Sequence, residues 1–190
     1  MEEHLFRFLA KHIVLNEEEK EVLLGFDLFR TYPKGLLLLD EGGFSKEAYF
    51  VIKGCLRTYY LQDGLEKTIA FYTEEEGITP ESLINQTPSK YCISCEEETI
   101  LLVSTPKMEK LVFEKFPKFE TLCRVLSEKE LANQQLAFAK MFNATPEERY
   151  LHLMKTKPKL LQRVPQYQIA SYIGVQPESL SRIRKRLKGK

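Results

Sequence analysis

Short apolar or alternating runs, separated by turn-forming residues, fill the chain between about residues 31 and 104. The runs are LLLL (36–39), AYFVI (48–52), CLRTYYL (55–61), TIAFY (68–72) and TILLV (99–103), with DEGG, KG, QDG and TPSK between them. Strands this short, interrupted this often, are typical of an antiparallel barrel or sandwich. We interpret KYCISCEEETILLV (90–103) as one strand, and Asp63-Gly64 is the strongest hairpin signal.

Helical patterns lie on both sides of this region. Asn16 and Glu19 fit a capping box at the start of an N-terminal helix. After residue 106 no further strand is evident, and a long helix is predicted over about 117–142. Its heptad seam, interrupted once by a lysine, consists of Leu122, Val125, Lys129, Ala132, Leu136 and Ala139. The helix is longer than a small barrel can cover, which favours a dimer interface over packing on the chain's own barrel.

A second domain is predicted to begin at about residue 143. Thr145-Pro146-Glu147-Glu148 combines a capping threonine, a proline at the first helical position and a glutamate that reaches back to the cap. Further on, a helix over about 166–172, a turn at Gly174 and a second helix opened by Pro177 form a helical hairpin. The sequence therefore predicts an α+β fold with domains 1–142 and 143–190.

Charge separates the two domains. Residues 143–190 hold eleven bases and three acids, a net charge of +8, so the rest carries −7 because the whole chain carries +1. A basic module on an acidic body indicates a polyanionic partner for that module. A solvated charged helix face is the alternative.

The cysteines and the apolar runs restrict which other functions and locations the sequence allows. The four cysteines include one close pair, Cys92 and Cys95, which could clip a metal or cycle its redox state. On a strand, a spacing of three puts the pair on opposite faces, which favours structural thiols without a metal or cofactor. No apolar run approaches the ~20 residues of a membrane span, and the acidic N-terminus is unlike a secretory signal, so we expect a cytoplasmic protein.

The second helix of the hairpin has one apolar face, with Leu180, Ile183 and Leu187 three and four residues apart. The opposite face offers acceptors and guanidinium groups, which suit base edges in a DNA major groove, while the later bases suit phosphates. The predicted DNA-contacting residues are Gln166, Tyr167, Pro177, Glu178, Ser179, Ser181, Arg182, Arg184, Lys185, Arg186 and Lys188.

These patterns resemble the Crp/Fnr transcription regulators over nearly the whole chain. The resemblance rests on YPKGLLLLDEGG, AYFVIKGCLRTYY and DGLEKTIAFY, followed by the long helix and VPQYQIASYIGVQPESLSRIRKRL. It implies a cyclic-nucleotide-binding-type β-roll of the jelly-roll kind, flanked by helices, and a C-terminal helix-turn-helix. Few residues follow the second helix, so we expect no full wing, with phosphate anchoring on the terminal lysines and on Gln166 and Tyr167.

The resemblance also implies a homodimer that reads a palindromic operator on double-stranded DNA, with a small-molecule effector and RNA polymerase as further candidate partners. The family's base-reading positions fall on Pro177, Glu178 and Arg182. The last two match the family's glutamate and arginine. Pro177 does not match the arginine of some members, so a different operator is expected at that contact.

The effector pocket departs from the cyclic-AMP-binding members, which use a Gly-Glu pair and an arginine followed by Ser or Thr. No arginine lies between Arg57 and Arg124. Acidic residues surround the remaining candidates, and a lysine lacks the bidentate fork of arginine, so we expect cyclic AMP not to bind in the usual mode. The candidate pocket residues are Glu81, Ser82, Leu83, Ser89 and Lys90.

Other sensor and enzyme classes fit less well. An iron-sulfur cluster would need cysteines before Cys55, and a haem or cupin-type metal would need histidines in the roll, whereas His4, His12 and His152 lie outside it. The sequence contains no recognisable nucleophile-and-base pair and no phosphate-binding loop, so it gives no support for an enzyme. The alternative function is a small-molecule-binding β-roll whose basic C-terminal helices dock on a protein or RNA.

Overall fold

The computed structural model describes residues 1–188, and the side chain of Lys188 lies outside what it describes, as do Gly189 and Lys190. Within that part, two four-stranded antiparallel sheets form a roll. One has the order β1 (Phe29–Tyr32), β8 (Thr99–Ser104), β3 (Ala48–Lys53) and β6 (Gly77–Ile78). The other has the order β2 (Leu37–Leu39), β7 (Cys92–Cys95), β4 (Leu56–Gln62) and β5 (Leu65–Tyr72). The predicted antiparallel β-roll with flanking helices is confirmed.

Side chains from both sheets fill the interior of the roll. The buried cluster consists of Leu39, Tyr49, Val51, Leu56, Ile78, Ile93, Cys95, Leu101 and Val103. Where the sheets approach each other, Gly54 has a φ of 111°, and a Cβ there would lie 2.5 Å from Thr99 Oγ1. Any side chain at this position would collide with β8, so the closing of the roll requires glycine here.

Two features of the roll differ from the sequence prediction. The segment 90–103 is not one strand: β7 and β8 belong to different sheets, and the turn between them carries Glu96, Glu97 and Glu98. Strands β1 and β6 were not predicted, because β1 is short and has no buried position and β6 has two residues. The hairpin at Asp63-Gly64 joins β4 and β5, and both residues have positive φ.

A second core joins the N-terminal helices to the far end of the roll. It involves α1 (Glu2–Leu9), α2 (Glu17–Leu24), α4 (Pro106–Lys115) and the start of α5 (Pro117–Asn143). The predicted capping box at α2 is present, since Asn16 Oδ1 accepts from Glu19 N at 2.9 Å and Glu19 Oε2 accepts from Asn16 N at 2.8 Å. A five-residue helix, α3 (Glu81–Asn85), lies between β6 and β7.

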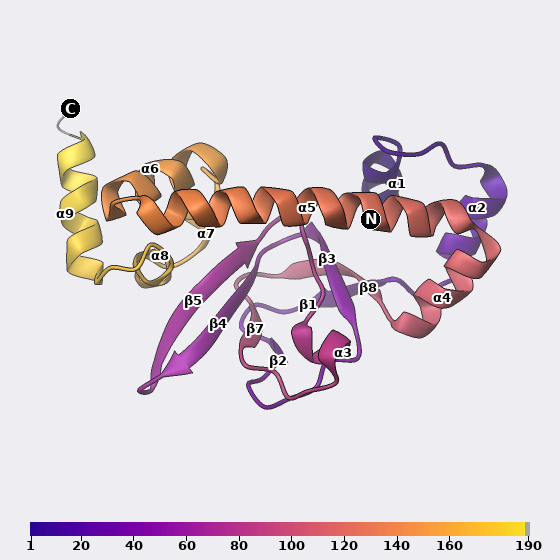
Figure 1. Cartoon of the computed structure of the whole chain (residues 1–190), viewed down its shortest axis with the longest axis horizontal. Helices are drawn as coiled ribbons and strands as arrows, with labels where there is room; N and C mark the ends of the chain where they lie inside the picture. Colours follow the sequence, from indigo (N-terminus) through magenta and orange to yellow (C-terminus); the bar gives the residue numbers. More distant parts are fainter. Residues whose placement is uncertain (189–190) are drawn as a thin grey trace.

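Helix α5 runs across the whole length of the molecule in Figure 1, with α1, α2 and α4 near its start and the C-terminal helices at its end. These are α6 (Pro146–Thr156), α7 (Leu160–Arg163), α8 (Gln166–Tyr172) and α9 (Pro177–Lys188). The predicted cap at Thr145 is present as a complete capping box. No helix within residues 1–188 is both long and apolar enough to cross a membrane.

The C-terminal helices pack on the roll. Their core of Tyr150, Leu153, Leu160, Val164, Ile169, Ala170, Ile173, Leu180 and Ile183 also contains Cys55 and Phe71. The Phe71 and Tyr172 rings meet edge-on with centroids 5.5 Å apart. The division at residue 143 stays a prediction, but the structure shows that the segment after it shares a core with β4 and β5.

Candidate nucleic-acid interface and its connection to the roll

The turn between α8 and α9 is fixed by glycine and arginine. Gly174 has a φ of 74°, and a Cβ there would lie 3.0 Å from Arg149 Nη1. Arg149 donates from Nη1 to the carbonyl of Ile173 and from Nε to the carbonyl of Ala144, both at 3.1 Å. The arginine of α6 therefore caps the end of α8 and holds the angle between the two helices of the hairpin.

Helix α9 buries the apolar face that its sequence predicts. Leu180 and Ile183 are almost fully buried, and Leu187 packs against the same core. The opposite face is open. Its exposed members are Pro177, Glu178, Ser181, Arg182, Lys185 and Arg186, whereas Ser179 and Arg184 are half-buried.

Two of the predicted phosphate contacts are held by other side chains. Arg184 Nη1 donates to Gln166 Oε1 at 2.5 Å, which joins α9 to the start of α8. Arg186 forms an ion pair with Glu147 of α6 at 3.1 Å. Tyr167 is exposed beside Gln166. Arg182 and Lys185 are thus the exposed bases of α9 that, among the described side chains, are bonded to no other side chain.

An open cleft of about 730 Å³ lies between α6 and α9. Its lining includes the start of α6 at Thr145 and Pro146, and Ser179, Arg182 and Arg186 of α9. The α6 wall also carries the carboxylates of Glu147 and Glu148, so charges of both signs line the cleft, and Glu147 already forms an ion pair with Arg186.

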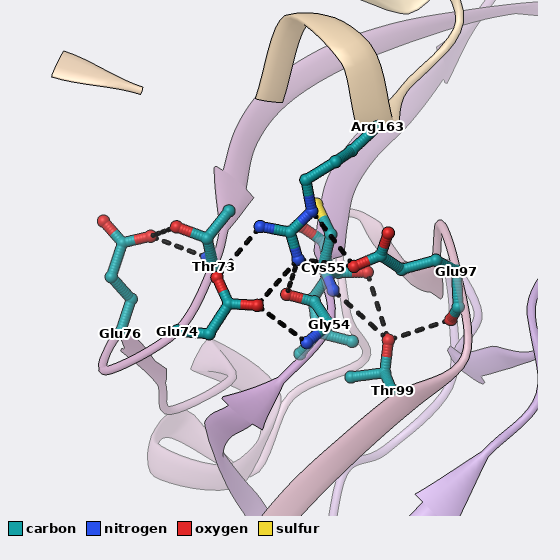
Figure 2. A network of polar contacts seen from close by, with 9 residues as sticks. Gly54, Cys55, Thr73, Glu74, Glu76, Glu97, Thr99 and Arg163 are labelled. Carbon is teal, nitrogen blue, oxygen red and sulfur yellow. Dashed lines mark hydrogen bonds and ion pairs between the residues drawn. The ribbon is translucent and has the colours of Figure 1, made fainter. Parts of the chain in front are cut away.

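Arg163, at the end of α7, is the centre of a polar cluster that connects the C-terminal helices to the roll (Figure 2). Its Nη1 and Nη2 donate to the two carboxylate oxygens of Glu74 at 2.9 and 2.8 Å. Its Nε donates to Glu97 Oε1 at 3.1 Å, and Nη2 also contacts that oxygen. Nη2 donates to the carbonyl of Gly54 at 2.7 Å. All three guanidinium nitrogens are thus bound to the roll, in the bidentate geometry that makes such pairs strong.

Further bonds join the same surfaces. Lys157 Nζ donates to Glu76 Oε2 at 2.6 Å and to the carbonyl of Phe71 at 2.7 Å. Ser171 Oγ of α8 accepts from the backbone N–H of Thr68 at 2.9 Å. The supporting helix of the hairpin is therefore attached to the edge of β5.

A buried chain of polar groups continues into the sheet. Gln168 Nε2 of α8 donates to Glu96 Oε2 at 2.7 Å, and Arg57 Nε donates to Glu96 Oε1 at 2.8 Å. Arg57 also forms an ion pair with Glu66, and its guanidinium lies 4.2 Å from the centre of the Tyr59 ring. The Arg57 side chain is only 4% exposed. Desolvation opposes its charge, but the two carboxylates outweigh it and raise the pKa of Arg57.

The sequence analysis missed these connecting residues and treated the acids of the roll only as groups that repel an anion. The donors are the charged groups of Lys157 and Arg163 and the neutral amide of Gln168; the acceptors are the carboxylates of Glu74, Glu76, Glu96 and Glu97. The signal that could have found them is the opposite charge of the two parts of the chain, since an acidic body and a basic module attract each other.

The candidate effector residues lie together but are bonded to one another. Glu81 Oε1 accepts from the backbone N–H of Lys90 at 2.8 Å, and Ser82 Oγ accepts from the N–H of Ser45 at 3.1 Å. Desolvation raises the pKa of Glu81, yet hydrogen bonds from Lys90, Tyr91 and Ser89 outweigh it and hold that pKa below its usual value. Leu83 is half-buried. A charged carboxylate therefore lies against Ser89 and Lys90 within the candidate pocket.

The seam predicted along α5 divides in the structure. Leu122 is buried in the core with the N-terminal helices. The later members, Val125, Lys129, Ala132, Leu136 and Ala139, are exposed. A second apolar face, which the sequence analysis did not identify, carries the exposed residues Leu131, Phe138 and Phe142.

Residues 29–115 match a family model described as the cyclic nucleotide-binding domain. The match covers the roll and α4 and leaves α5 to α9 outside it. This segment is therefore a cyclic-nucleotide-binding-type roll. A search of curated proteins finds no match.

Solved structures resemble a longer part of the chain. FixK2 from Bradyrhizobium japonicum has a TM-score of 0.69 at 19% identity, over 85% of this chain and 84% of that one. CLP from Xanthomonas campestris, described as a c-di-GMP responsive global regulator, has a TM-score of 0.68 at 17% identity, over 92% of both chains. A CooA mutant from Carboxydothermus hydrogenoformans has a TM-score of 0.63 at 16% identity, over 85% of this chain and 76% of that one. The chain has the fold of these proteins.

Proposed function

We propose that the chain is a homodimeric, sequence-specific DNA-binding transcription regulator of the Crp/Fnr type, with a sensor in residues 1–142 and a DNA-binding domain in residues 143–190. The observation that carries the proposal is α9. Its apolar face is buried in the C-terminal core, and its opposite face presents Glu178, Arg182 and Lys185 to solvent. A helix held in this way can enter a major groove without unfolding its support.

Each exposed residue has a role that its chemistry supports. Arg182 can donate two hydrogen bonds to guanine, and Glu178 can accept from the amino group of cytosine. Lys185 supplies a charge for phosphate, and Tyr167 at the start of α8 supplies a hydroxyl. Pro177 has neither charge nor donor, so base reading at that position differs from that of relatives with arginine there.

Dimerisation through α5 supports reading of a palindromic site. The exposed part of the seam, from Val125 to Ala139, is long enough to pair with a second copy of the helix. Two copies of α9 would then address two half-sites about one DNA turn apart. In this proposal the roll responds to an effector other than cyclic AMP, and DNA-bound dimers act on RNA polymerase.

The test is selection of binding duplexes from a random pool, followed by gel-shift titration at several salt concentrations. We expect a palindromic consensus and a salt slope of several units. Arg182→Ala should relax selection at one base pair per half-site, at a cost of about 1–3 kcal/mol for the preferred base. Lys185→Ala should weaken all duplexes alike.

Equal, weak binding to every duplex would overturn the proposal. Tighter binding to single-stranded RNA than to duplex DNA would instead favour a β-roll protein whose basic helices dock on RNA. The two substitutions remove the same charge from one helix, so each serves as the control for the other.

A further inference from the structure

The connection between α5 and the C-terminal helices is short. Helix α5 ends at Asn143 and α6 begins at Pro146, with Ala144 in an extended conformation between them. A joint of this kind allows two rigid elements to pivot, because a few backbone dihedrals can absorb the whole rotation. Contacts outside this joint therefore set the orientation of the C-terminal helices α6 to α9.

Those contacts include the shared core, the bonds of Lys157 and Ser171, and the bonds of Arg163 and Gln168 to the roll. Arg163 holds Glu74, Glu97 and the Gly54 carbonyl, and Gln168 holds Glu96. Glu74 lies in the loop after β5 and Glu97 lies in the turn between β7 and β8, so the two carboxylates hold Arg163 from two sides (Figure 2). We call these five side chains, Glu74, Glu96, Glu97, Arg163 and Gln168, the latch.

The latch leaves the proposed recognition face free. Arg163 and Gln168 bind the roll from α7 and α8, whereas Glu178, Arg182 and Lys185 of α9 stay exposed. Helix α9 is also the outermost element at its end of the molecule in Figure 1. A docked hairpin can thus still meet DNA, and docking fixes the direction in which it does so.

We propose that the latch sets the orientation of each helix-turn-helix on its own roll, so that a dimer can bind two half-sites at once. The latch also couples the structure of the roll to the DNA-binding helices directly, independently of α5. This inference rests on the proposed function. A dimer gains affinity from two half-sites only when both copies of α9 reach their half-sites together. Release of the hairpin removes that gain and leaves binding to one half-site intact.

The test compares a full palindromic duplex with a duplex that contains one half-site. Arg163→Met removes the centre of the latch, and its partners Glu74 and Glu97 are 43% and 32% exposed, so they can regain water. We expect affinity for the full site to fall by about tenfold or more, and affinity for the half-site to change by less than about twofold. Arg163→Lys keeps the charge but not the fork and should lie between.

Lys159→Met is the matched control, because it removes the same charge from an exposed position four residues earlier. Its affinities should equal those of the wild type. Glu97→Gln combined with Glu74→Gln breaks the latch from the other side and should reproduce the effect of Arg163→Met. Equal losses on both duplexes, or no loss on either, would overturn the positioning role.

Pulsed-EPR distances test the latch without DNA. Spin labels at Gln62→Cys on the roll and Lys155→Cys on α6, in a Cys123→Ser background and diluted with an excess of unlabelled protein so that a dimer carries at most one labelled copy, should give one narrow distribution in the wild type and with Lys159→Met. Arg163→Met should broaden it. An unchanged narrow distribution would refute the latch even where DNA affinity falls. If the wild type binds no duplex selectively, the proposed function fails while the distance distributions still decide whether the latch exists.

Discussion

Gln168 of α8 lies 2.7 Å from Glu96 of the roll, measured between Nε2 and Oε2, although 72 residues separate them in sequence. The other oxygen of Glu96 accepts from Arg57 of β4, whose buried guanidinium also bonds to Glu66 and Thr68 of β5. The proposed DNA-binding helices are thus connected by hydrogen bonds to the Arg57–Glu96 ion pair of the roll. A change of structure at Arg57 would reach α8 through two hydrogen bonds.

Arg57→Met should destabilise the fold strongly. It leaves Glu96 buried without its cation, and loss of one member of a buried pair costs about 3–5 kcal/mol. The free energy of unfolding from urea titration measures the effect. Arg124→Met, which removes an exposed partner of Glu128 on α5, should cost less than about 0.5 kcal/mol. Similar costs for both substitutions would contradict the importance of burial at Arg57.

The contribution of Glu74 should depend on pH. Desolvation raises the pKa of Glu74, but hydrogen bonds from Arg163 and from backbone N–H groups outweigh it and hold that pKa below its ordinary value of 4.5. The unfolded chain then binds the proton more readily than the folded one. The charged carboxylate therefore stabilises the fold above about pH 4.5, and this contribution is lost as the pH falls through the lower folded pKa.

Glu74→Gln should accordingly lower the urea midpoint at pH 7 and should approach the wild type at about pH 3. Glu128→Gln, at an exposed position of α5, is the control and should show little difference at either pH. A gap between Glu74→Gln and the wild type that widens on acidification would show that the sign is wrong.

Much of the fold could be predicted because its signals are local. The capping boxes at Asn16 and Thr145, the Asp63-Gly64 hairpin and the apolar face of α9 each depend on residues within a few positions of one another, and each is present in the structure. The prediction of one strand over residues 90–103 was wrong, because the apolar residues on the two sides of the turn at Glu96, Glu97 and Glu98 resemble a single pattern. Only pairing with β2, β4, β1 and β3 reveals that the chain changes sheets there.

The latch could not be found in this way. Arg163 and Gln168 meet Glu74, Glu96 and Glu97 across 66 to 89 residues of sequence, and no local pattern marks an acid as a partner rather than a solvated charge. The opposite net charges of the two parts indicate attraction, but they do not identify which of the many acids and bases pair. Which residues of α9 contact DNA stays a prediction.

Leu136→Glu should weaken dimerisation. Leu136 is 56% exposed in the single chain and lies in the apolar seam of α5, where a second copy of the helix would bury it. A charge there would need to be desolvated in the interface. Sedimentation velocity should show a shift from dimer to monomer at micromolar concentration. Ser127→Glu adds the same charge on the opposite side of the helix and should keep the dimer; loss of the dimer in both would place the interface elsewhere.

Thiol labelling should separate Cys123 from the other three cysteines. Cys123 is exposed, whereas Cys55, Cys92 and Cys95 are buried. Desolvation raises the pKa of Cys55 to about 12 and that of Cys95 to about 11, so neither forms the reactive thiolate near neutral pH. Maleimide should add once to the native protein and four times in denaturant, as measured by intact mass. Fast labelling of Cys55 would show that the C-terminal helices leave the roll readily.

Cyclic AMP should not bind to the wild-type roll with appreciable affinity. The segment between Arg57 and Arg124 offers no arginine for the cyclic phosphate, and the Lys90 N–H is already occupied by the Glu81 carboxylate at 2.8 Å. Because the pKa of Glu81 lies below its usual value, this carboxylate is charged at neutral pH and repels a second anion.

Isothermal titration should give no heat of binding at about 1 mM ligand, where a micromolar site would saturate. Ile84→Ala, at an exposed position on the same short helix, is a control for nonspecific effects. Saturable binding by the wild type with a Kd in the micromolar range would contradict the expectation that this roll, without an arginine for the cyclic phosphate, does not bind cyclic AMP.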